Sequence, residues 1–225
     1  MADNNNRVAI VDFDLGNLFS VQQACRVAGI NAFITRDPKE VAGADAVILP
    51  GVGGFPLAMS VLKQRGLISS IKDVAASGRL LVGVCLGMQL LMDGSTEFGH
   101  TDGLGLIAGS ADKLPDLDGG NGRPVPIPNV GWSGVTPAFE GAWSESPLDG
   151  TRPGTRFYFV HSYFVTPRQN SDAMAMSQFG SMSYCAAVRR GNILGFQFHP
   201  ERSGEVGLQL YRALPPLIES AKGKR

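Results

Sequence analysis

The first half of this chain alternates short apolar runs with segments of helical periodicity. Short apolar runs bounded by turn residues are typical of buried strands, and apolar residues three and four apart are typical of amphipathic helices. The strand-like runs are 7–11, 30–35, 44–49 and 79–84, and the helical patterns are 18–28, 55–65, 67–77 and 86–92. Strands that alternate with helices are joined by right-handed crossovers, which make the strands parallel and cover both faces of their sheet. We therefore predict an α/β fold with an open, mostly parallel, doubly wound sheet.

The second half has a different pattern. Segment 115–153 is rich in proline and glycine, and we expect one short strand in it, near 130–135. Four strand-like runs then follow closely, at 156–160, 173–176, 184–189 and 193–198. Arg190-Gly191-Asn192 is expected to turn the last two runs into a hairpin, which predicts a smaller antiparallel β portion.

The chain is expected to end in one more helix. Residues 206–214 have an amphipathic pattern, followed by Pro215-Pro216. Proline lacks the backbone N–H and clashes with the preceding turn, so we expect this pair to stop or kink the helix.

Composition limits the kind of protein this can be. The 225 residues suit a single domain over 1–225 with a full core, and the polar residues 1–6 are expected to be disordered. The 20 basic and 20 acidic side chains cancel, which argues against nucleic acid or a membrane surface as the main partner. Three cysteines argue against a secreted disulfide scaffold. With no signal-like segment and no long apolar run, we expect a cytoplasmic protein.

The sequence Gly83-Val84-Cys85-Leu86-Gly87 has the form of a nucleophile elbow with cysteine in place of serine. A sharp strand-to-helix turn raises one side chain above the sheet edge, and the flanking glycines remove side chains that would clash. Cys85 would then lie at a helix N-terminus, which favours the thiolate, and the N–H of Leu86 would point to where an oxyanion forms. Gln89, one helical turn further, would face the same pocket. The alternative is a small buried cysteine in a glycine-rich packing turn.

A nucleophilic cysteine needs a base, and His199 is the best candidate. It follows an apolar strand and precedes Pro200-Glu201. In extended backbone, residues two apart point the same way, so Glu201 could orient the imidazole that His199 offers to Cys85. Taken alone, His199 is a hydrogen-bonded histidine at a strand end and Glu201 a solvated loop acid. Together with the elbow, they favour catalysis.

The remaining histidines and cysteines favour structural roles. His161 is expected at a strand end or in the core, with neighbours that could line a pocket through their backbone, and His100 is expected to be solvated. Cys25 and Cys185 are expected to be buried packing residues. No cysteine or histidine spacing matches a zinc site, and we expect no metal and no cofactor.

Residues 50–54, Pro-Gly-Val-Gly-Gly, follow a predicted strand at the same sheet edge as Cys85. Open α/β sheets bind ligands at this edge. The run lacks the lysine and the glycine spacing of known phosphate-binding loops. Two interpretations stay open: a plain turn, or a mobile peptide that donates an N–H to an oxyanion.

Taken together, these residues resemble the class I, triad-type glutamine amidotransferases. Within that family they are similar to the glutaminase subunits of imidazole glycerol phosphate synthases. The segments that carry the resemblance are 11–21, 49–53, 83–91, 103–107, 130–132, 158–163 and 195–204, which span nearly the whole chain. The elbow and the His-Pro-Glu run indicate the family. The runs Asp-x-Gly-Asn-Leu, Pro-Gly-Val-Gly, His-Ser-Tyr and Gly-Trp indicate the subgroup.

The resemblance implies an activity and a set of site residues. Cys85 would attack the side-chain amide of L-glutamine to give a thioester and ammonia, with His199 moving the proton and Glu201 orienting it. Water would then release glutamate. The resemblance places the glutamine-binding groups at Gly53, Gln89, Glu97, His161, Ser162 and Tyr163. The oxyanion donors would be Leu86 together with Val52 and Gly53, once the peptide between Gly51 and Val52 flips.

The resemblance also implies a partner, a cyclase with a (β/α)₈ barrel that receives the ammonia in a heterodimer. Trp132 and Asn17 would lie at that interface, although Trp132 could equally be an ordinary buried aromatic residue. The family's usual Pro-His-Met-Gly-Trp-Asn run reads Pro-Asn-Val-Gly-Trp-Ser at 128–133, which leaves details of the interface open. The alternatives are a glutaminase that serves another synthase, of the anthranilate, aminodeoxychorismate or sugar-modifying type, and a catalytically silent interaction module.

Overall fold

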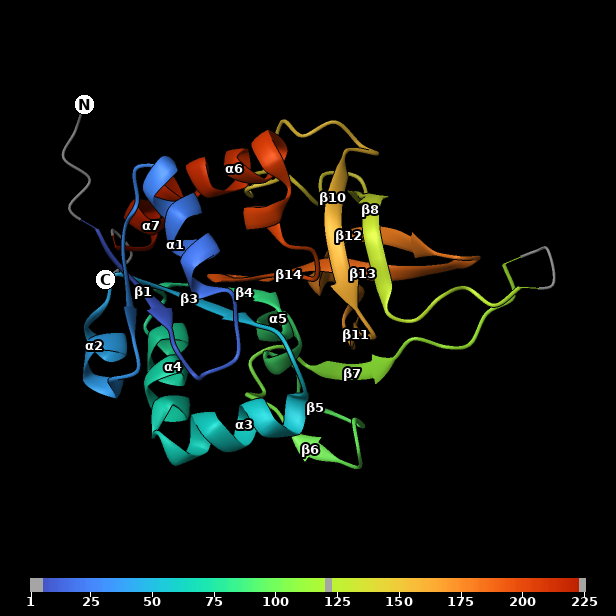
Figure 1. The fold of residues 1–225 in the computed structure, drawn as a ribbon. Coiled ribbons are helices and arrows are strands. Elements are labelled where there is room, and N and C mark those ends of the chain that lie inside the picture. Colours follow the sequence, from blue (N-terminus) through green and yellow to red (C-terminus); the bar gives the residue numbers. More distant parts are fainter. Residues whose placement is uncertain (1–5, 120–122, 223–225) are drawn as a thin grey trace.

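Five parallel strands form one side of the main sheet. The structure is a computed structural model that describes residues 6–119 and 123–222. Of the segment 1–6 that was expected to be disordered, residues 1–5 lie outside the described residues and Asn6 is buried. The parallel strands lie in the order β2-β1-β3-β4-β14 (Figure 1). Their bounds are Arg7–Val11 for β1, Asn31–Thr35 for β2, Ala46–Gly51 for β3, Leu80–Cys85 for β4 and Ile193–Phe196 for β14. Because all five run the same way, the chain leaves β1, β3 and β4 at one edge, which confirms the predicted parallel arrangement.

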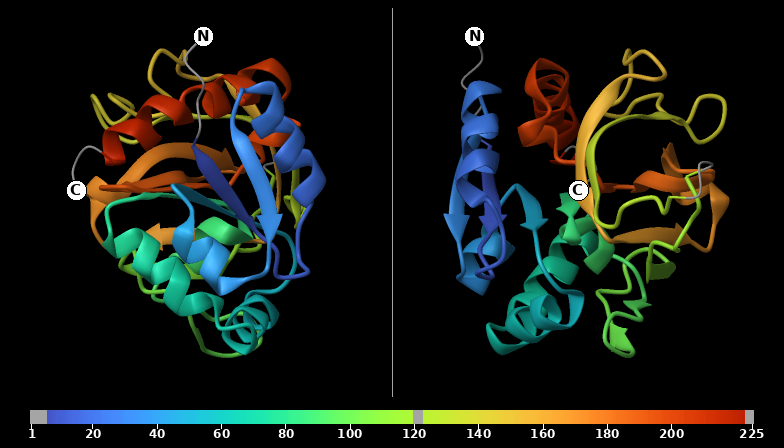
Figure 2. Two further views of the ribbon diagram at one scale, coloured as in Figure 1. Left: turned by 90° about the vertical axis from the view of Figure 1, so that its left-hand side faces the viewer. Right: turned by 45° about the vertical axis from the view of Figure 1, so that its right-hand side comes forward.

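Helices cover both faces of this parallel part (Figures 1 and 2). One face carries α1 (Leu18–Val27), α6 (Gly204–Arg212) and α7 (Leu214–Lys222), and the other carries α2 (Pro38–Gly43), α3 (Phe55–Gln64) and α4 (Leu67–Ala76). Among the described residues, no helix has the length and apolar character needed to cross a membrane.

Each face of the sheet has its own apolar core. Along β1, Val8 and Ile10 pack into the core beneath α1 and α6, whereas Ala9 and Val11 pack into the core beneath α2 to α4. Successive residues of a strand point to opposite faces, so a strand buried on both sides is apolar throughout. This is why the runs that predicted the parallel strands are continuous rather than alternating.

Mostly antiparallel strands extend the same sheet beyond β14, with β5 and β7 as a parallel pair among them. β13 (Met182–Arg190) pairs with β14 through the predicted hairpin turn, and the sheet continues through β11, β7, β5 and β6. β12 pairs with β13 outside this order, and β9 pairs with β12. The bounds are Gly94–Ser95 for β5, Thr101–Asp102 for β6, Gly109–Lys113 for β7, Thr136–Pro137 for β9, Tyr163–Pro167 for β11 and Ala173–Phe179 for β12. The predicted antiparallel portion is confirmed.

A separate two-stranded sheet stands beside the main sheet (Figure 1). It pairs β8 (Asn129–Gly134) with β10 (Arg156–His161), and Trp132 faces Tyr158 in this pairing. The short strand expected near 130–135 is therefore β8, one residue earlier than predicted.

Three features of the fold differ from the sequence-based expectation. Helix α2, capped by the Asp37 side chain, and strands β5, β6, β7 and β11 were not anticipated. The last helix was expected over 206–214, but α6 ends at Arg212 and α7 starts at Leu214. Pro215 and Pro216 thus lie in the first turn of a new helix, where a missing N–H breaks no intrahelical bond. They mark a helix start, not only a stop.

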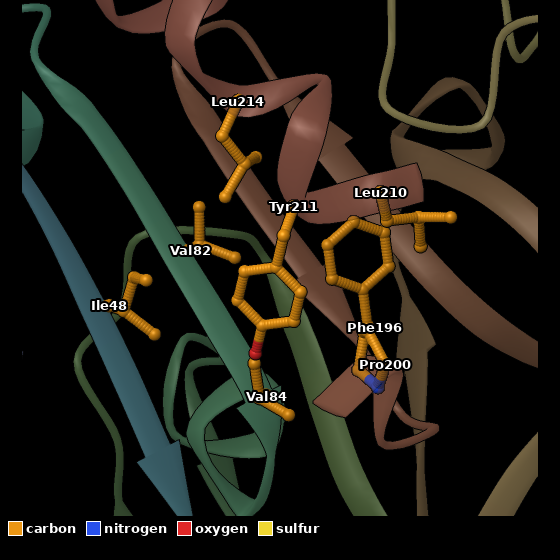
Figure 3. A pocket seen from close by; sticks show the side chains of 8 residues that line it. All are labelled: Ile48, Val82, Val84, Phe196, Pro200, Leu210, Tyr211 and Leu214. Atoms are coloured by element: carbon orange, nitrogen blue, oxygen red, sulfur yellow. The ribbon is translucent and has the colours of Figure 1, made fainter. Parts of the chain in front are cut away.

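The seam between α6 and the sheet contains a small apolar cavity of about 10 Å³ (Figure 3). Its lining residues are Ile48, Val82, Val84, Phe196, Pro200, Leu210, Tyr211 and Leu214. The aromatic ring of Tyr211 points from α6 toward the strands between these apolar side chains. The hydroxyl group of Tyr211 is buried here without a hydrogen-bond partner.

Candidate active site

Cys85 ends β4 in a strained conformation. Its φ is 54° and its ψ is −111°, outside the regions that residues with a side chain normally adopt. Helix α5 (Leu86–Leu90) starts directly after it. Such strain persists only where the surrounding structure enforces it, and it is typical of a nucleophile elbow.

Close packing of the backbone enforces this turn. A Cβ atom on Gly87 would lie 1.7 Å from the carbonyl oxygen of Leu49, and one on Gly83 would lie 2.7 Å from the carbonyl carbon of Gly87. Neither position has room for a side chain. The flanking glycines are therefore required for the reason that the sequence suggested, since they let α5 pack directly on β4 and β3.

His199 and Glu201 form a buried pair near the end of β14. The Nδ1 atom of His199 lies 2.8 Å from Oε1 of Glu201, and only 5% and 2% of their side chains are exposed. The expectation of extended backbone was wrong in detail, because β14 ends at Phe196 and residues Pro200–Arg202 form a 3-10 turn. The turn still brings the two side chains together.

The surroundings of His199 favour its protonated form. Burial alone would lower its pKa, but the interactions with Cys85 and Glu201 outweigh burial and raise the pKa to about 10. Glu201 occupies Nδ1, and the buried Nε2 atom makes no hydrogen bond. That nitrogen is therefore free to exchange a proton with the sulfur of Cys85 or with a bound molecule.

A serine that the sequence analysis did not single out holds the backbone of His199 in place. Ser203 Oγ donates to the carbonyl oxygen of His199 at 2.7 Å and accepts from the N–H of Tyr158 at 3.0 Å. The N–H of His199 in turn donates to the carbonyl oxygen of Tyr158 at 2.9 Å. These bonds attach the histidine to β10, and Ser203 has no sequence signal beyond its closeness to His199.

A cavity of about 300 Å³ opens above Cys85. It is lined by Val52, Gly53, Cys85, Leu86, Gln89, Glu97, Pro128, Val160, His161, Ser162 and Tyr163. All six glutamine-binding candidates are in this set, as are the three oxyanion candidates. The volume is at the lower end of the range of roughly 300–1,000 Å³ typical of small-molecule sites.

Two side chains of the cavity are held by the backbone around them. Gln89 Nε2 donates to the carbonyl oxygen of Tyr163 at 3.0 Å, and Glu97 Oε2 accepts from the N–H of Phe55 at 2.6 Å. Phe55 begins α3, where the helix dipole favours a carboxylate. Both side chains are buried, and both place hydrogen-bonding atoms in the wall of the cavity.

His161 belongs to a buried polar network. Its Nδ1 atom donates to the carbonyl oxygen of Tyr163 at 2.8 Å, so Nε2 is the acceptor. Asn129 Nδ2 lies 3.0 Å and the hydroxyl of Tyr184 lies 3.2 Å from Nε2. Burial is the main cause that lowers the pKa of His161 to about 4, so it is neutral near pH 7. No sequence pattern indicates that Asn129 and Tyr184 contact His161, because the three residues come from different strands.

The candidate oxyanion donors are not equally available. Leu86 follows Cys85 at the start of α5 and lines the cavity. The N–H of Val52, however, donates to the carbonyl oxygen of Leu15 at 3.4 Å. In this arrangement Val52 does not offer its N–H to the cavity, although the residue is 41% exposed and lines the cavity.

The two predicted interface residues lie outside the cavity. Trp132 is 45% exposed and packs edge-to-face on Tyr158, so it is not an ordinary core aromatic residue. Asn17 caps α1 by accepting from the N–H of Ser20 at 3.3 Å. His100, Cys25 and Cys185 also stay outside the site. His100 is exposed beside Asp102, and both cysteines are buried, which raises their pKa to about 12.

Comparison with known proteins agrees with this geometry. The model of the family described as glutamine amidotransferase class-I matches residues 9–211 of the chain. The chain belongs to the class-I glutamine amidotransferases. Cys85, His199 and Glu201 all lie within the matched range.

Two relatives of this amidotransferase are called imidazole glycerol phosphate synthase subunit HisH. The protein from Moorella thermoacetica is 39% identical over 214 residues, which cover 95% of this chain and 96% of the relative. The protein from Symbiobacterium thermophilum is 43% identical over 206 residues, which cover 91% of each.

Solved structures share the fold of this amidotransferase. PurLQS from Thermotoga maritima has a TM-score of 0.66 at 19% identity, with 93% of this chain and 97% of that chain covered. The glutaminase domain of CTPS from Trypanosoma brucei, solved with bound acivicin, has a TM-score of 0.64 at 18% identity, with 98% and 95% covered. At these identities the likeness concerns the fold alone.

Proposed function

We propose that this chain hydrolyses L-glutamine to glutamate and ammonia with Cys85, His199 and Glu201 as a catalytic triad. The observation that carries the proposal is the buried His199–Glu201 pair beside a strained Cys85 that opens into a cavity of suitable size. A thiol, a base and an orienting carboxylate in this relation are the parts that acyl transfer requires.

In the proposed reaction, the Cys85 thiolate attacks the side-chain carbonyl carbon of glutamine. His199 is the imidazolium at this stage, as its pKa of about 10 favours, and it gives the Nε2 proton to the leaving nitrogen. The C–N bond breaks, ammonia leaves and a thioester remains on Cys85. His199, now neutral, takes a proton from water, which attacks the thioester. Glutamate leaves, and the thiolate–imidazolium pair is restored.

The oxyanion that forms in each step needs donors. We propose that Leu86, which lines the cavity, supplies one N–H, and that Val52 and Gly53 supply the other after Val52 leaves the carbonyl oxygen of Leu15. One such donor typically changes the rate by about 10²–10³-fold. A switch of this peptide would restrict the release of ammonia to occasions when it can be used.

The proposed consumer of the ammonia is a cyclase subunit with a (β/α)₈ barrel, in a heterodimer that serves histidine biosynthesis. Support comes from the relatives' name, which describes a subunit of imidazole glycerol phosphate synthase. Trp132 and Asn17 are the proposed contacts with that subunit. We place the heterodimer in the cytoplasm, where the three free cysteines would stay reduced.

The test is a Cys85→Ser variant assayed in complex with a candidate cyclase. We expect glutamine-dependent synthesis to fall to background, because the hydroxyl is a far weaker nucleophile, while synthesis with added ammonia continues. A Cys25→Ala variant is the matched control, since Cys25 is a buried thiol of α1 outside the cavity. Loss of both activities in Cys85→Ser, or retention of glutamine-dependent synthesis, would contradict the proposal.

A further inference from the structure

Gln197 is a fully buried amide in contact with Cys85 and Gln89, and neither the sequence analysis nor the proposed triad accounts for it. It follows β14, two residues before His199, and none of its surface is exposed. Its backbone N–H donates to the carbonyl oxygen of Ala186 at 2.9 Å, which holds it against β13. A buried amide is costly unless its polar atoms have partners, so its contacts indicate its role.

The backbone carbonyl of Tyr163 sets the direction of a chain of hydrogen bonds. A carbonyl oxygen can only accept, so the atom of Gln89 that faces it at 3.0 Å must be the donor Nε2. The second hydrogen of Nε2 then needs an acceptor, which is Oε1 of Gln197 at 3.1 Å. With its oxygen used in this way, Gln197 has only its own Nε2 to present on the other side.

That nitrogen faces the sulfur of Cys85. Gln197 Nε2 donates to Sγ of Cys85 at 3.7 Å, an ordinary distance for a bond to sulfur. Sγ is also 3.7 Å from the carbonyl oxygen of Val160, which can accept from the thiol but repels a thiolate. The donor from Gln197 acts in the opposite sense, because a hydrogen bond strengthens when its acceptor becomes charged.

We propose that Gln197 is a further catalytic residue, whose amide stabilises the thiolate of Cys85 and at the same time locks the orientation of Gln89. The inference deepens the proposed glutaminase and rests on it for the roles of Cys85 and Gln89. With its nitrogen committed to Tyr163 and Gln197, Gln89 presents its Oε1 as an acceptor for substrate. One amide thus links the nucleophile to a wall of the substrate pocket.

The experiment compares Gln197→Met and Gln197→Glu with the wild type in the full chain. Methionine keeps the length and burial but removes the donor and the acceptor, and glutamate replaces the donor with an acceptor. Alkylation of Cys85 by iodoacetamide is followed from pH 5 to pH 10 by mass spectrometry, so that Cys25 and Cys185 are counted separately. Gln178→Glu, an exposed site on β12, is the matched control.

We expect alkylation at pH 7 to slow by about tenfold or more in both variants, with the profile moving to higher pH, and Gln178→Glu to match the wild type. In the complex with the cyclase, we expect kcat to fall, because the thiolate of Cys85 loses its donor. We expect KM for glutamine to rise, because the Gln89 side chain loses the hydrogen bond that holds its orientation. Ammonia-dependent synthesis should be unchanged. If Gln197→Met does not fold, Gln197→Glu carries the same comparison.

Two results separate this inference from the proposed function. If the wild type hydrolyses glutamine and the alkylation profile of the variants is unshifted, the role of Gln197 is wrong and the glutaminase stands. If the profile shifts but the wild-type complex hydrolyses no glutamine, the proposed function is wrong, while the effect of Gln197 on the thiolate is supported. A change in thermal stability with no change in the profile would also overturn the inference.

Discussion

Two buried tyrosines of this chain have opposite surroundings at the scale of single residues. The hydroxyl of Tyr184 lies 3.2 Å from both Asn129 Nδ2 and His161 Nε2, so it exchanged water for protein partners on folding. The hydroxyl of Tyr211 is buried among apolar side chains of the α6 seam and has no partner (Figure 3). Burial raises the pKa of both phenols, but only one of them has hydrogen bonds that offset the loss of water.

Replacement of each tyrosine by phenylalanine should therefore change stability in opposite directions. Tyr211→Phe removes an unsatisfied group and should raise the free energy of unfolding by about 1 kcal/mol. Tyr184→Phe removes a partner from the buried network and should lower it by about the same amount. Urea denaturation at pH 7 measures both. Destabilisation by Tyr211→Phe equal to that by Tyr184→Phe would show that the Tyr211 hydroxyl is bonded after all.

At the scale of elements, the junction between β4 and α5 decides where the nucleophile lies. The junction holds Cys85 at positive φ because α5 starts immediately and packs on β3 without intervening side chains. Gly83 and Gly87 are needed because they have no side chain, not because their backbone angles are unusual, since only Cys85 in this turn has a positive φ. Strain at the nucleophile and close packing around it therefore depend on each other.

Filling this junction should break it. Gly87→Ala places a methyl group against the carbonyl oxygen of Leu49, which is backbone and cannot move aside as a flexible side chain could. We therefore expect the free energy of unfolding to fall by about 3 kcal/mol or more, and glutaminase activity to be lost. Gly43→Ala is the matched control, because its Cβ meets nothing within 4 Å at the end of α2. Urea denaturation and a glutamate assay give both readouts. A Gly87→Ala variant within about 1 kcal/mol of the wild type would contradict the packing argument.

At the scale of the whole molecule, the parallel strands collect exposed apolar residues at one edge. Phe19 follows the loop after β1 and is 67% exposed, and Val52 follows β3 and is 41% exposed. Trp132 lies on β8, which pairs with β10. β10 in turn reaches the site, because the carbonyl oxygen of its Val160 contacts Sγ of Cys85. Exposed apolar groups near a reactive site are typical of an interaction surface, and this edge is where the proposed cyclase would receive ammonia.

If Trp132 is the interface contact that we propose, Trp132→Ala should weaken binding to the cyclase by about tenfold or more. It should leave the free energy of unfolding nearly unchanged, because the ring is half-exposed and not part of the core. Isothermal titration with the cyclase and urea denaturation measure the two effects. Val27→Ala is the control, since this exposed residue lies at the end of α1 that is remote from Asn17, the other proposed contact. Unchanged affinity with lowered stability would assign the tryptophan to packing within this chain.

Local pattern was sufficient to predict strands β1 to β4 of the parallel half, although not helix α2, and to name the three triad candidates. Buried strands are continuous apolar runs, the elbow needs glycine on both sides of Cys85, and the contact of His199 with Glu201 spans only two residues. Each of these patterns lies within a few neighbouring positions, so it can be recognised in the sequence without knowing how the rest of the chain folds.

Only the tertiary structure decided the remainder. Strand β7, Gly-Ser-Ala-Asp-Lys, has little intrinsic strand preference and forms because β11 pairs with it. The contact between Gln197 and Cys85 joins residues 112 positions apart, and the network of His161 with Asn129 and Tyr184 joins three strands. Hydrogen bonds between distant side chains depend on which strands the fold places side by side, and no periodicity in the sequence encodes that placement.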